Sequence, residues 1–158
     1  MNTELMAGAF LKCNDKVLIM HRGLHKKLNP GLWAPIGGHL QPHEINAPEE
    51  ACLREIVEEA NIQANSIHDF KLRYIIVRNS RGLIYINYLF FGELIAQCEL
   101  PPCDEGTLHW VDFDTLPHYP MSFSVQQAIV HRMSNPENCS VVLGAVNSEN
   151  SKVVWNEL

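Results

Sequence analysis

The sequence lacks any long apolar run. No stretch approaches the roughly 18 apolar residues that a membrane-spanning helix needs. The first residues, MNTELMAGAFLKCNDK, have neither the basic segment nor the apolar core of a secretory signal peptide. We therefore expect a cytoplasmic protein without membrane contact.

Basic residues are also scarce. The chain has 12 Lys and Arg against 18 Asp and Glu, which gives a formal net charge of -6 over 158 residues. Proteins that bind nucleic acid polymers usually carry a basic surface, so such a partner is not expected. An acidic protein that acts on phosphates needs a divalent cation, because bare carboxylates repel the substrate.

Cysteines are few, and they do not pair in any familiar spacing. There are five, an odd number, and no C-x-x-C motif occurs. This argues against a disulfide framework and favours reduced thiols. His39 and His43 stand four residues apart, but they lie in a loop with glycine and proline, so a zinc site is not expected either.

The patterns that are present predict an α/β protein with a mixed sheet. A length of 158 residues is typical of one domain. Alternating or continuous apolar runs, separated by turn residues, predict strands over 5–12, 16–22, 72–79, 83–95 and 108–113, and a terminal hairpin over about 140–158. Turns are expected at Asn14-Asp15 and at 79–82.

Two helices are predicted from apolar spacing. The first spans about 47–60, with the stripe Leu53, Ile56, Val57 and Ala60. Asn46 with Glu49 has the pattern of a capping box, and Asn61 suits a left-handed residue at the end of the helix. The second spans 122–133, with the apolar side Phe123, Val125, Ile129 and Met133.

The first helix carries an acidic face. Glu55, Glu58 and Glu59 stand at i, i+3 and i+4, which places the three carboxylates together. Like charges this close destabilise a helix, and a cation held among them would reverse the effect. Oxygen ligands suit Mg²⁺ or Mn²⁺. A charge run alone is more often a solvated face, but here a glycine pair, Gly37-Gly38, precedes the helix.

The segment from Gly38 to Ile62 resembles the Nudix box, G-x5-E-x7-R-E-U-x-E-E-x-G-U, where U is a bulky apolar residue. The matching positions are Gly38, Glu44, Arg54, Glu55, Ile56, Glu58, Glu59 and Ile62. The upstream LIMHR and GLW and the downstream EGTLHWVDFDTLP are similar to MutT-type Nudix hydrolases. The resemblance therefore covers most of the chain.

Two positions depart from the motif. Nine residues, not seven, separate Glu44 from Arg54. Asn61 replaces the closing glycine, and asparagine tolerates the same left-handed backbone conformation. The insertion bears on the place of Glu44 and leaves the carboxylate face of the helix unchanged.

The resemblance implies a fold and a metal site. It implies one Nudix domain over 1–158, folded as an α/β/α sandwich around a mixed sheet. In the family, box glutamates and the carbonyl of the preceding glycine hold the cation, which maps here to Glu55, Glu58, Glu59 and Gly37. Gly38, Glu44 and Arg54 would support the box. The expected cofactor is Mg²⁺, with Mn²⁺ as an alternative.

The resemblance also implies the reaction. Nudix hydrolases cleave a phosphoanhydride bond in nucleoside diphosphates linked to another moiety, by attack of water on phosphorus. Glu55 and Glu58 would be catalytic. Glu105, in Asp104-Glu105-Gly106, resembles a loop glutamate of the family that acts as ligand or base, and a solvated turn carboxylate is an equal alternative.

Residues for substrate binding follow from the same likeness. Arg22 resembles an arginine that contacts phosphate. Tyr119 and Met121 lie where MutT-type relatives border the purine, although packing at the start of a helix explains them equally well. A solvated loop is the simpler interpretation of residues 25–27, and Trp33 fits a core position better than a base platform.

The substrate is expected to be a small nucleotide. Signatures of several other Nudix branches are missing, which leaves a nucleoside triphosphate such as 8-oxo-dGTP, cleaved to a monophosphate and pyrophosphate. A nucleotide sugar, ADP-ribose, a dinucleoside polyphosphate and a non-catalytic nucleotide-binding module are the alternatives. A homodimer is a further option, because strand 83–95 and the terminal hairpin could pack within the fold or against a second subunit.

Overall fold

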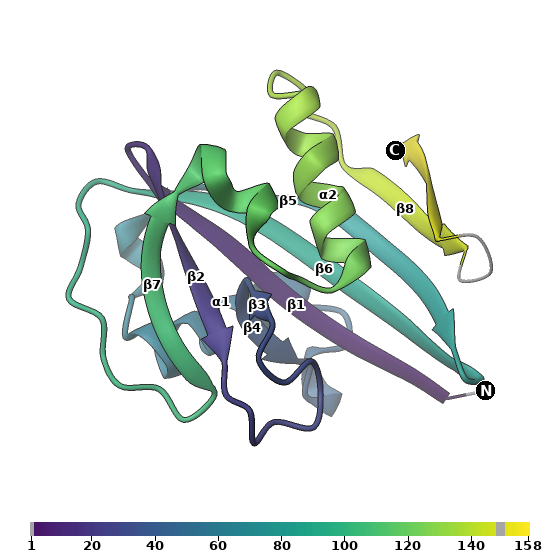
Figure 1. The fold of residues 1–158 in the computed structure, drawn as a ribbon, viewed down its shortest axis with the longest axis horizontal. Coiled ribbons are helices and arrows are strands. Elements are labelled where there is room, and N and C mark those ends of the chain that lie inside the picture. Colours follow the sequence, from purple (N-terminus) through teal and green to yellow (C-terminus); the bar gives the residue numbers. More distant parts are fainter. Residues whose placement is uncertain (1, 148–150) are drawn as a thin grey trace.

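One mixed sheet with a helix on each face organises the chain (Figure 1). The computed structural model describes residues 2–147 and 151–158. The strands are β1 (Asn2–Cys13), β2 (Lys16–Arg22), β3 (Trp33–Ala34), β4 (Ile36–His39), β5 (Ile67–Ser80), β6 (Leu83–Leu94), β7 (Gly106–Asp112), β8 (Val142–Asn147) and β9 (Lys152–Glu157). The helices are α1 (Pro48–Ala60) and α2 (Phe123–Ser134), with short 3-10 turns at Pro42–Glu44, Ala64–Ser66 and Phe113–His118.

Strand β6 lies in the middle of the sheet. It runs parallel to β1 and antiparallel to β5, and β8 continues the sheet parallel to β5, with β9 beyond it. Leu89 and Phe90 of β6 are fully buried. The sequence left open whether this apolar strand packs within the fold or against a second subunit. Both edges of β6 are paired within the sheet, while residues 83–88 are only partly buried and Ile95 is 81% exposed.

The predicted turns occur where the sequence places them. Arg81 and Gly82 both have positive φ, 53° and 77°, as a two-residue hairpin between right-twisted strands requires. Asn14, between β1 and β2, also has a positive φ. The terminal hairpin of β8 and β9 is confirmed, and the expected turn at 148–150 lies outside the described residues.

Helix α1 matches its predicted bounds, but not its predicted cap. The residue before the helix is Ala47, and no side chain caps it, so the capping box of Asn46 and Glu49 is wrong. Pro48 occupies the first position, where a missing N–H leaves no bond unmade. At the other end, Asn61 is left-handed and donates its backbone N–H to the Val57 carbonyl at 3.0 Å, as predicted.

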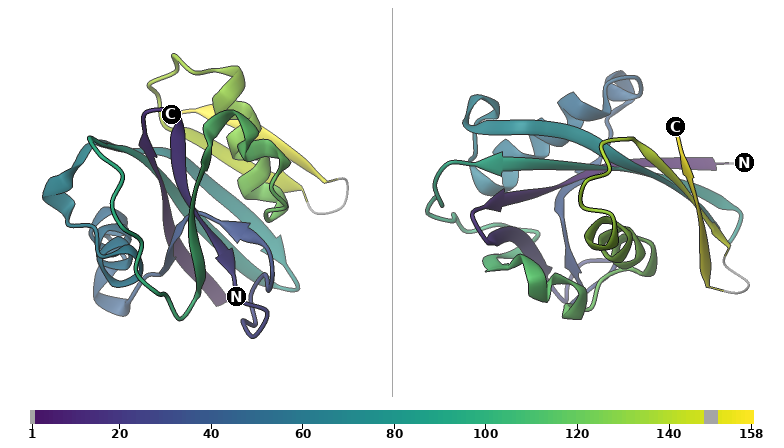
Figure 2. Two further views of the ribbon diagram at one scale, coloured as in Figure 1. Left: turned by 60° about the vertical axis from the view of Figure 1, so that its left-hand side comes forward. Right: turned by 90° about the horizontal axis from the view of Figure 1, so that it is seen from above.

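The two helices cover opposite faces of the sheet (Figure 2). Ile56 of α1 packs in one core cluster with Leu11 and Phe90. Ile129 of α2 packs in another with Phe10. This is the α/β/α sandwich that the sequence predicted. Phe123 corrects the prediction for α2, because it is 39% exposed rather than part of the buried side.

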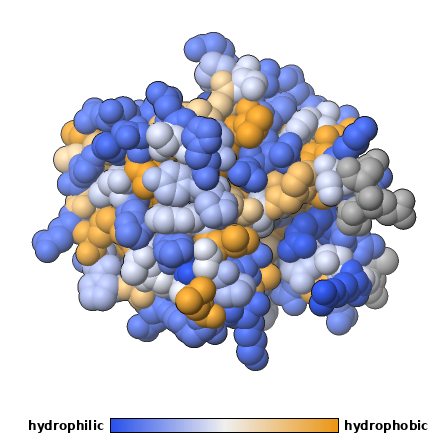
Figure 3. Space-filling view, in the orientation of Figure 1, coloured by the Kyte–Doolittle hydropathy of each residue, from blue (hydrophilic) through white to orange (hydrophobic). Residues whose placement is uncertain are grey.

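The exposed apolar area is divided among separate loops. Leu24, Ile45 and Ile95 are the most exposed large apolar side chains apart from the C-terminal residue, and each follows a different strand or turn. On the face drawn in Figure 3, apolar areas are interspersed in a mainly hydrophilic surface. Within residues 2–147 and 151–158, neither helix is long and apolar enough to span a membrane.

Candidate active site

A cleft of about 670 Å³ opens beside the glycine pair of β4. Its lining comes from β1, β4 and α1, from the loop between β2 and β3, from the facing ends of β5 and β6, and from the start of α2. Segments far apart in the sequence therefore meet here. Strand β4 pairs with β1 on one side and packs against α1 on the other, which places the glycines directly beneath the acidic helix.

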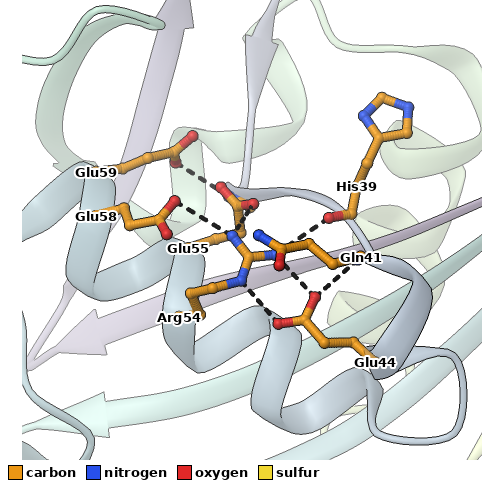
Figure 4. A network of polar contacts seen from close by, with 8 residues as sticks. His39, Gln41, Glu44, Arg54, Glu55, Glu58 and Glu59 are labelled. Atoms are coloured by element: carbon orange, nitrogen blue, oxygen red, sulfur yellow. Dashed lines mark hydrogen bonds and ion pairs between the residues drawn. The ribbon is translucent and has the colours of Figure 1, made fainter.

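Glu44 and Arg54 form the most complete polar contact near the cleft (Figure 4). Arg54 Nε donates to Glu44 Oε1 at 2.8 Å, and Nη2 donates to Oε2 at 3.0 Å. The backbone N–H of Gln41 donates to the same carboxylate at 2.8 Å. These bonds, the arginine first, lower the pKa of Glu44 to about 2. The longer interval between Glu44 and Arg54 leaves this pair intact.

The three glutamates of the acidic face have different surroundings. Glu59 is only 6% exposed and accepts a hydrogen bond from the Gly37 N–H at 3.2 Å. Glu55 is largely buried and accepts from Arg54 Nη1 at 2.6 Å. Glu58 is exposed and accepts from the same nitrogen at 3.2 Å. Glu55 and Glu59 line the cleft, whereas Glu58 does not.

Burial disfavours the charged form of the two glutamates that line the cleft. Burial raises the pKa of Glu55, and the Arg54 bond only partly opposes it. Burial, together with the neighbouring charge of Glu55, raises the pKa of Glu59 to about 8, although the hydrogen bond from the Gly37 N–H opposes this. For both glutamates the effect of burial outweighs that of the arginine nearby, and a bound cation would stabilise their charged forms.

The glycine pair is required by close packing. A Cβ at Gly37 would collide with the backbone carbonyl of Ala7, on the paired strand β1. A Cβ at Gly38 would lie 2.7 Å from the carboxyl carbon of Glu55. Larger residues would therefore separate β4 from β1 or displace a cleft carboxylate.

The donors present fit a hard divalent cation. Glu55 and Glu59 offer carboxylate oxygens at one end of the cleft, next to the backbone of Gly37. Among the described residues, no three His, Cys, Asp or Glu side chains already form a ligand group. Arg54 contacts both Glu55 and Glu58, so a third carboxylate ligand would have to exchange this contact for the cation.

Cationic side chains also line the cleft. Arg22, Lys26 and Lys27 line it, from the end of β2 and the loop that follows. Arg22 Nε donates to the Leu28 carbonyl at 2.9 Å, which ties the loop to the strand. Residues 25–27 were expected to form a solvated loop; His25 and Lys27 are exposed in this loop, and Lys26 is partly buried. Two adjacent lysines shortly after a strand end were the available signal for this cationic lining.

Glu105 is held at the same end of the cleft. Its carboxylate lies 2.6 Å from Lys26 Nζ, and its backbone carbonyl accepts from the Gly23 N–H at 3.0 Å. His25 Nε2 also contacts the Asp104 carbonyl at 3.1 Å. These contacts hold the loop after β2 and the loop before β7 together. The charge of Glu105 adds to the causes that raise the pKa of Glu55 and Glu59, after burial.

Tyr119 and Met121 lie outside the cleft lining. Met121 is 6% exposed and packs in the core cluster with Val125. The Tyr119 ring meets the Trp33 ring edge-on at 4.7 Å between centroids, and both pack against the same cluster. Of the two explanations for Tyr119 and Met121, the structure supports packing at the entry to α2 rather than contact with a purine. Trp33 packs against the core, as expected.

Sequence analysis did not identify the residues that line the cleft away from Glu55 and Glu59. They are Ile76 and Arg78 of β5, Tyr85 and Asn87 of β6, and Ser122, Ser124 and Val125 around the start of α2. Strand alternation could have grouped Ile76 with Arg78, and Tyr85 with Asn87, on one face each. It could not have shown that the two strands pair there, or that α2 begins beside them.

Comparison with known proteins gives the family. The NUDIX domain model matches residues 3–132, which include the whole glycine and glutamate segment. The chain belongs to the NUDIX family. It is therefore a Nudix hydrolase, a pyrophosphohydrolase that acts on phosphoanhydride bonds of nucleoside diphosphate-linked substrates. Nudix hydrolases generally use divalent metals.

Solved structures share the fold of this Nudix domain at low sequence identity. The MutT protein of Bacillus halodurans has a TM-score of 0.73 at 17% identity, over 98% of this chain and 97% of that chain. The MutT protein of Methanosarcina mazei Go1 has a TM-score of 0.70 at 17% identity, over 87% and 97%. A bifunctional NMN adenylyltransferase/ADP ribose pyrophosphatase of Francisella tularensis has a TM-score of 0.62 at 20% identity, over 84% and 41%.

Proposed function

We propose that the protein hydrolyses a nucleoside triphosphate to a monophosphate and pyrophosphate, with Mg²⁺ or Mn²⁺ as cofactor. The observation that carries this proposal is the set of groups that line one cleft. Carboxylates of α1 line one part, and cationic side chains from the end of β2 and the loop after it line a second. Polar and apolar side chains of β5, β6 and the start of α2, together with the Arg78 guanidinium, line a third. A cation, a phosphate chain and a nucleoside would match these three parts. An oxidised purine triphosphate such as 8-oxo-dGTP is the leading candidate.

The carboxylates would hold the cation. Glu55 and Glu59 are the nearest donors, with the Gly37 carbonyl beside them, and Glu58 stays a candidate third ligand because it shares Arg54 with Glu55. When bound, the cation would supply charge neutralisation for the phosphate oxygens and acidify the attacking water. Arg54, which lines the cleft, and Glu44, which does not, would support this part of the helix.

The cationic side chains and Glu105 would bind the phosphates and move the proton. Arg22 and Lys27 would donate to phosphate oxygens, for which charge-assisted bonds are strongest. Glu105 would accept the proton of the attacking water, with Lys26 holding its carboxylate in position. Positioning and charge neutralisation supply most of what transfer at phosphorus requires.

A second candidate substrate is ADP-ribose. The Francisella tularensis neighbour, whose name includes ADP ribose pyrophosphatase, has the same fold over 84% of this chain. ADP-ribose also carries a diphosphate between two larger groups, so it would use the same carboxylates and cationic side chains. The two candidates differ in what would occupy the part of the cleft lined by β5, β6 and the start of α2.

A hydrolysis panel tests the proposal. The substrates are dGTP, 8-oxo-dGTP, the other deoxynucleoside triphosphates, ADP-ribose, a dinucleoside polyphosphate and a nucleotide sugar, each with Mg²⁺ and with Mn²⁺. Pyrophosphate and phosphate are measured separately. We expect one triphosphate to give monophosphate and pyrophosphate in the wild type and not in Glu59→Gln. Turnover restricted to ADP-ribose, or release of single phosphates, would contradict the proposal.

A further inference from the structure

A second cavity of about 670 Å³ lies beside the other end of helix α2. The first turn of α2 lines the cleft of the box glutamates, through Ser124 and Val125, whereas its last turn lines this cavity, through Arg132 and Met133. The two share no lining residue. A cavity of this volume is large enough for a small organic molecule. Its lining therefore indicates which kind of molecule would fit.

Four basic side chains line the second cavity without a carboxylate partner. They are Lys12 of β1, Lys71 and Arg73 of β5, and Arg132 of α2. Within residues 2–147 and 151–158, none of the four forms an ion pair. The whole chain has only 12 Lys and Arg and a net charge of -6, so a third of its basic side chains meet at one cavity. Like charges this close are unfavourable, and a bound anion would stabilise them.

The carboxylates of the second cavity are more exposed than most of its cations. Three carboxylates also line it, and all three are exposed: Asp69, Glu93 and Asp114. Lys12, Arg73 and Arg132 are partly buried. Solvent screens exposed charges more strongly than partly buried ones. The partly buried cations therefore dominate the electrostatic potential inside the cavity, and the net effect favours an anion.

The two arginines of the second cavity are tied to neighbouring carbonyls. Arg132 Nη1 donates to the Asn138 carbonyl at 2.6 Å, and Arg73 Nη1 donates to the next carbonyl, that of Cys139, at 2.6 Å. Each of these bonds uses one nitrogen of a guanidinium, so further N–H donors remain for a ligand. Two guanidinium groups anchored in this way can share one carboxylate or phosphate group.

Irregular pairing in β5 brings its basic side chains to this cavity. The β5–β6 ladder shifts register between His68 and Lys71, and again between Leu72 and Tyr74. Arg73 is the extra residue of the second shift. Regular alternation would direct Arg73 and Tyr74 to opposite faces of the sheet. Instead, Arg73 lines the cavity beside α2 while Tyr74 also packs beneath α2. Bulges commonly redirect a side chain at a functional site.

Aromatic side chains form the apolar part of the lining. Phe10 and Phe91 lie with their ring centroids 5.4 Å apart, and Phe113 lines the same cavity. Lys12 Nζ lies 4.8 Å from the Phe113 ring centroid, and Arg132 Cζ lies 5.8 Å from that of Phe91. Positive groups and aromatic rings are therefore neighbours throughout the cavity. A ligand that joins a flat apolar body to an anionic group would contact both.

We propose that the second cavity binds a small organic anion that carries an aromatic ring. Its carboxylate or phosphate group lies on Arg73 and Arg132, and its ring packs against Phe91 and Phe113. An inorganic anion would leave the rings uncovered, and a neutral aromatic molecule would leave the guanidinium groups without an anion. Tight binding therefore requires both parts in one molecule. The site is separate from the metal-dependent cleft, and the proposal does not rest on the proposed function.

The test is equilibrium dialysis of the whole protein in chelator, so that no cation draws a phosphate into the cleft. The probes AMP and 2-naphthoate join an aromatic body to a phosphate or a carboxylate, and adenosine and inorganic phosphate each lack one part. The variants at the second cavity are Arg73→Met and Lys71→Glu. Lys152→Glu is the matched control, because Lys152 is an exposed strand lysine that lines neither cavity. Lys27→Met removes a cation from the cleft instead.

We expect at least one of AMP and 2-naphthoate to bind the wild type with a Kd below about 1 mM, well within what a ligand of this size can reach. Adenosine and phosphate should bind at least about 10-fold more weakly. Arg73→Met should raise the Kd about 10- to 100-fold, the effect of losing hydrogen bonds to a charged group. Lys71→Glu should raise it about 5- to 10-fold, because it reverses a charge at an exposed position. Lys152→Glu and Lys27→Met should keep the wild-type Kd.

The two probes also separate the sources of the anionic group. Tighter binding of AMP assigns a phosphate ligand, and tighter binding of 2-naphthoate assigns a carboxylate ligand. Failure of both probes to bind at about 10 mM, a concentration that detects even weak sites, would overturn the proposal. Adenosine binding as tightly as AMP would overturn it too, as would a Kd that rises in Lys27→Met and not in Arg73→Met. If Arg73→Met does not fold, Lys71→Glu decides, and a Kd equal to that of Lys152→Glu would overturn the proposal.

Discussion

Glu44 and Glu59 are almost equally buried, 5% and 6% exposed, yet their carboxyl groups have opposite tendencies. The pKa of Glu44 is lowered to about 2, because Arg54 grips its carboxylate with two donors. The pKa of Glu59 is raised to about 8, because burial and the charge of Glu55 outweigh one backbone N–H. The two lie within one short segment of the chain and differ in whether a positive charge reaches them.

The comparison divides the glycine and glutamate segment into two parts. Glu44 and Arg54 form the supporting half, and Glu55 and Glu59 form the reactive half. The Glu44 carboxylate already accepts hydrogen bonds from Arg54 and from the Gln41 N–H, and it holds the loop against the helix. Glu55 and Glu59 keep raised pKa values despite their hydrogen bonds from Arg54 and from the Gly37 N–H, so a bound cation would stabilise their charged forms. Native proteins commonly accept such local cost at functional sites.

The largest expected effect is on activity at the reactive half. Glu59→Gln should lower kcat/KM by about 10³-fold or more, because a neutral amide binds a divalent cation poorly and cation stabilisation is worth several kcal/mol in the transition state. The melting temperature should stay the same or rise. Glu50→Gln, an exposed glutamate of the same helix, is the control and should retain wild-type activity. Equal loss in both variants would contradict the comparison.

Gly38→Ala should lower kcat/KM by about 100-fold, the effect of a displacement of about 1 Å in a catalytic group. The added methyl group would lie where the Glu55 carboxylate now lies, so that carboxylate must move. Kinetics at increasing Mg²⁺ would measure it, and the metal concentration for half-maximal rate should increase. Wild-type kinetics in this variant would mean that the Glu55 position is not critical.

Arg54→Met removes the ion pair between Arg54 and Glu44 in the supporting half. It leaves Glu44 buried without its partner, so the melting temperature at neutral pH should fall by several degrees, more than in Glu59→Gln. The lowered pKa of Glu44 means that its stabilising contribution is present above pH 4.5 and is lost as the pH falls through about 2. The difference between variant and wild type in thermal melts should therefore shrink in acid. A difference that is constant with pH would point to lost packing by the arginine instead.

The smallest expected effect is the pH dependence of the metal-free protein. A raised folded-state pKa means that the contribution of Glu59 is fully present below pH 4.5 and is lost as the pH rises through about 8. Each pKa unit corresponds to about 1.4 kcal/mol, so the unfolding free energy in chelator should fall by a few kcal/mol across this range. Denaturant titrations at pH 5 and pH 9 measure this. Glu59→Gln should flatten the dependence, and a slope unchanged in that variant would assign it to other groups.

Local patterns account for the parts of the fold that depend on local physics. The left-handed Asn61 and the Arg81-Gly82 turn follow from short-range spacing, and both are found. Of the predicted helix stripe, Ile56 and Ala60 are buried, whereas Leu53 and Val57 are only partly buried. The predicted helix cap at Asn46 is wrong, because no side chain makes a capping hydrogen bond at the start of α1. The chain enters α1 through Ala47 and Pro48 instead.

The cleft depends on contacts that no short window contains. The box glutamates could be named from the sequence, but their different burial follows from how β4 packs under α1. Tyr119 and Met121 have the right chemistry for a base, yet the start of α2 draws Met121 into the core. Asn87 is unremarkable in its strand, and it enters the cleft only through the pairing of β6 with β5 beside α2.

The most direct test of the central claim is a Mn²⁺ titration of the wild type, Glu59→Gln and Glu50→Gln by calorimetry at neutral pH in buffers of different ionisation heat. The account predicts that the wild type and Glu50→Gln bind Mn²⁺ and release protons, because the cation replaces the proton that the Glu59 carboxyl group holds in the metal-free protein. Binding and proton release should both be lost or greatly weakened in Glu59→Gln. Mn²⁺ binding of equal affinity and equal proton release in all three proteins would contradict the claim that the buried carboxylates of α1 form the cation site.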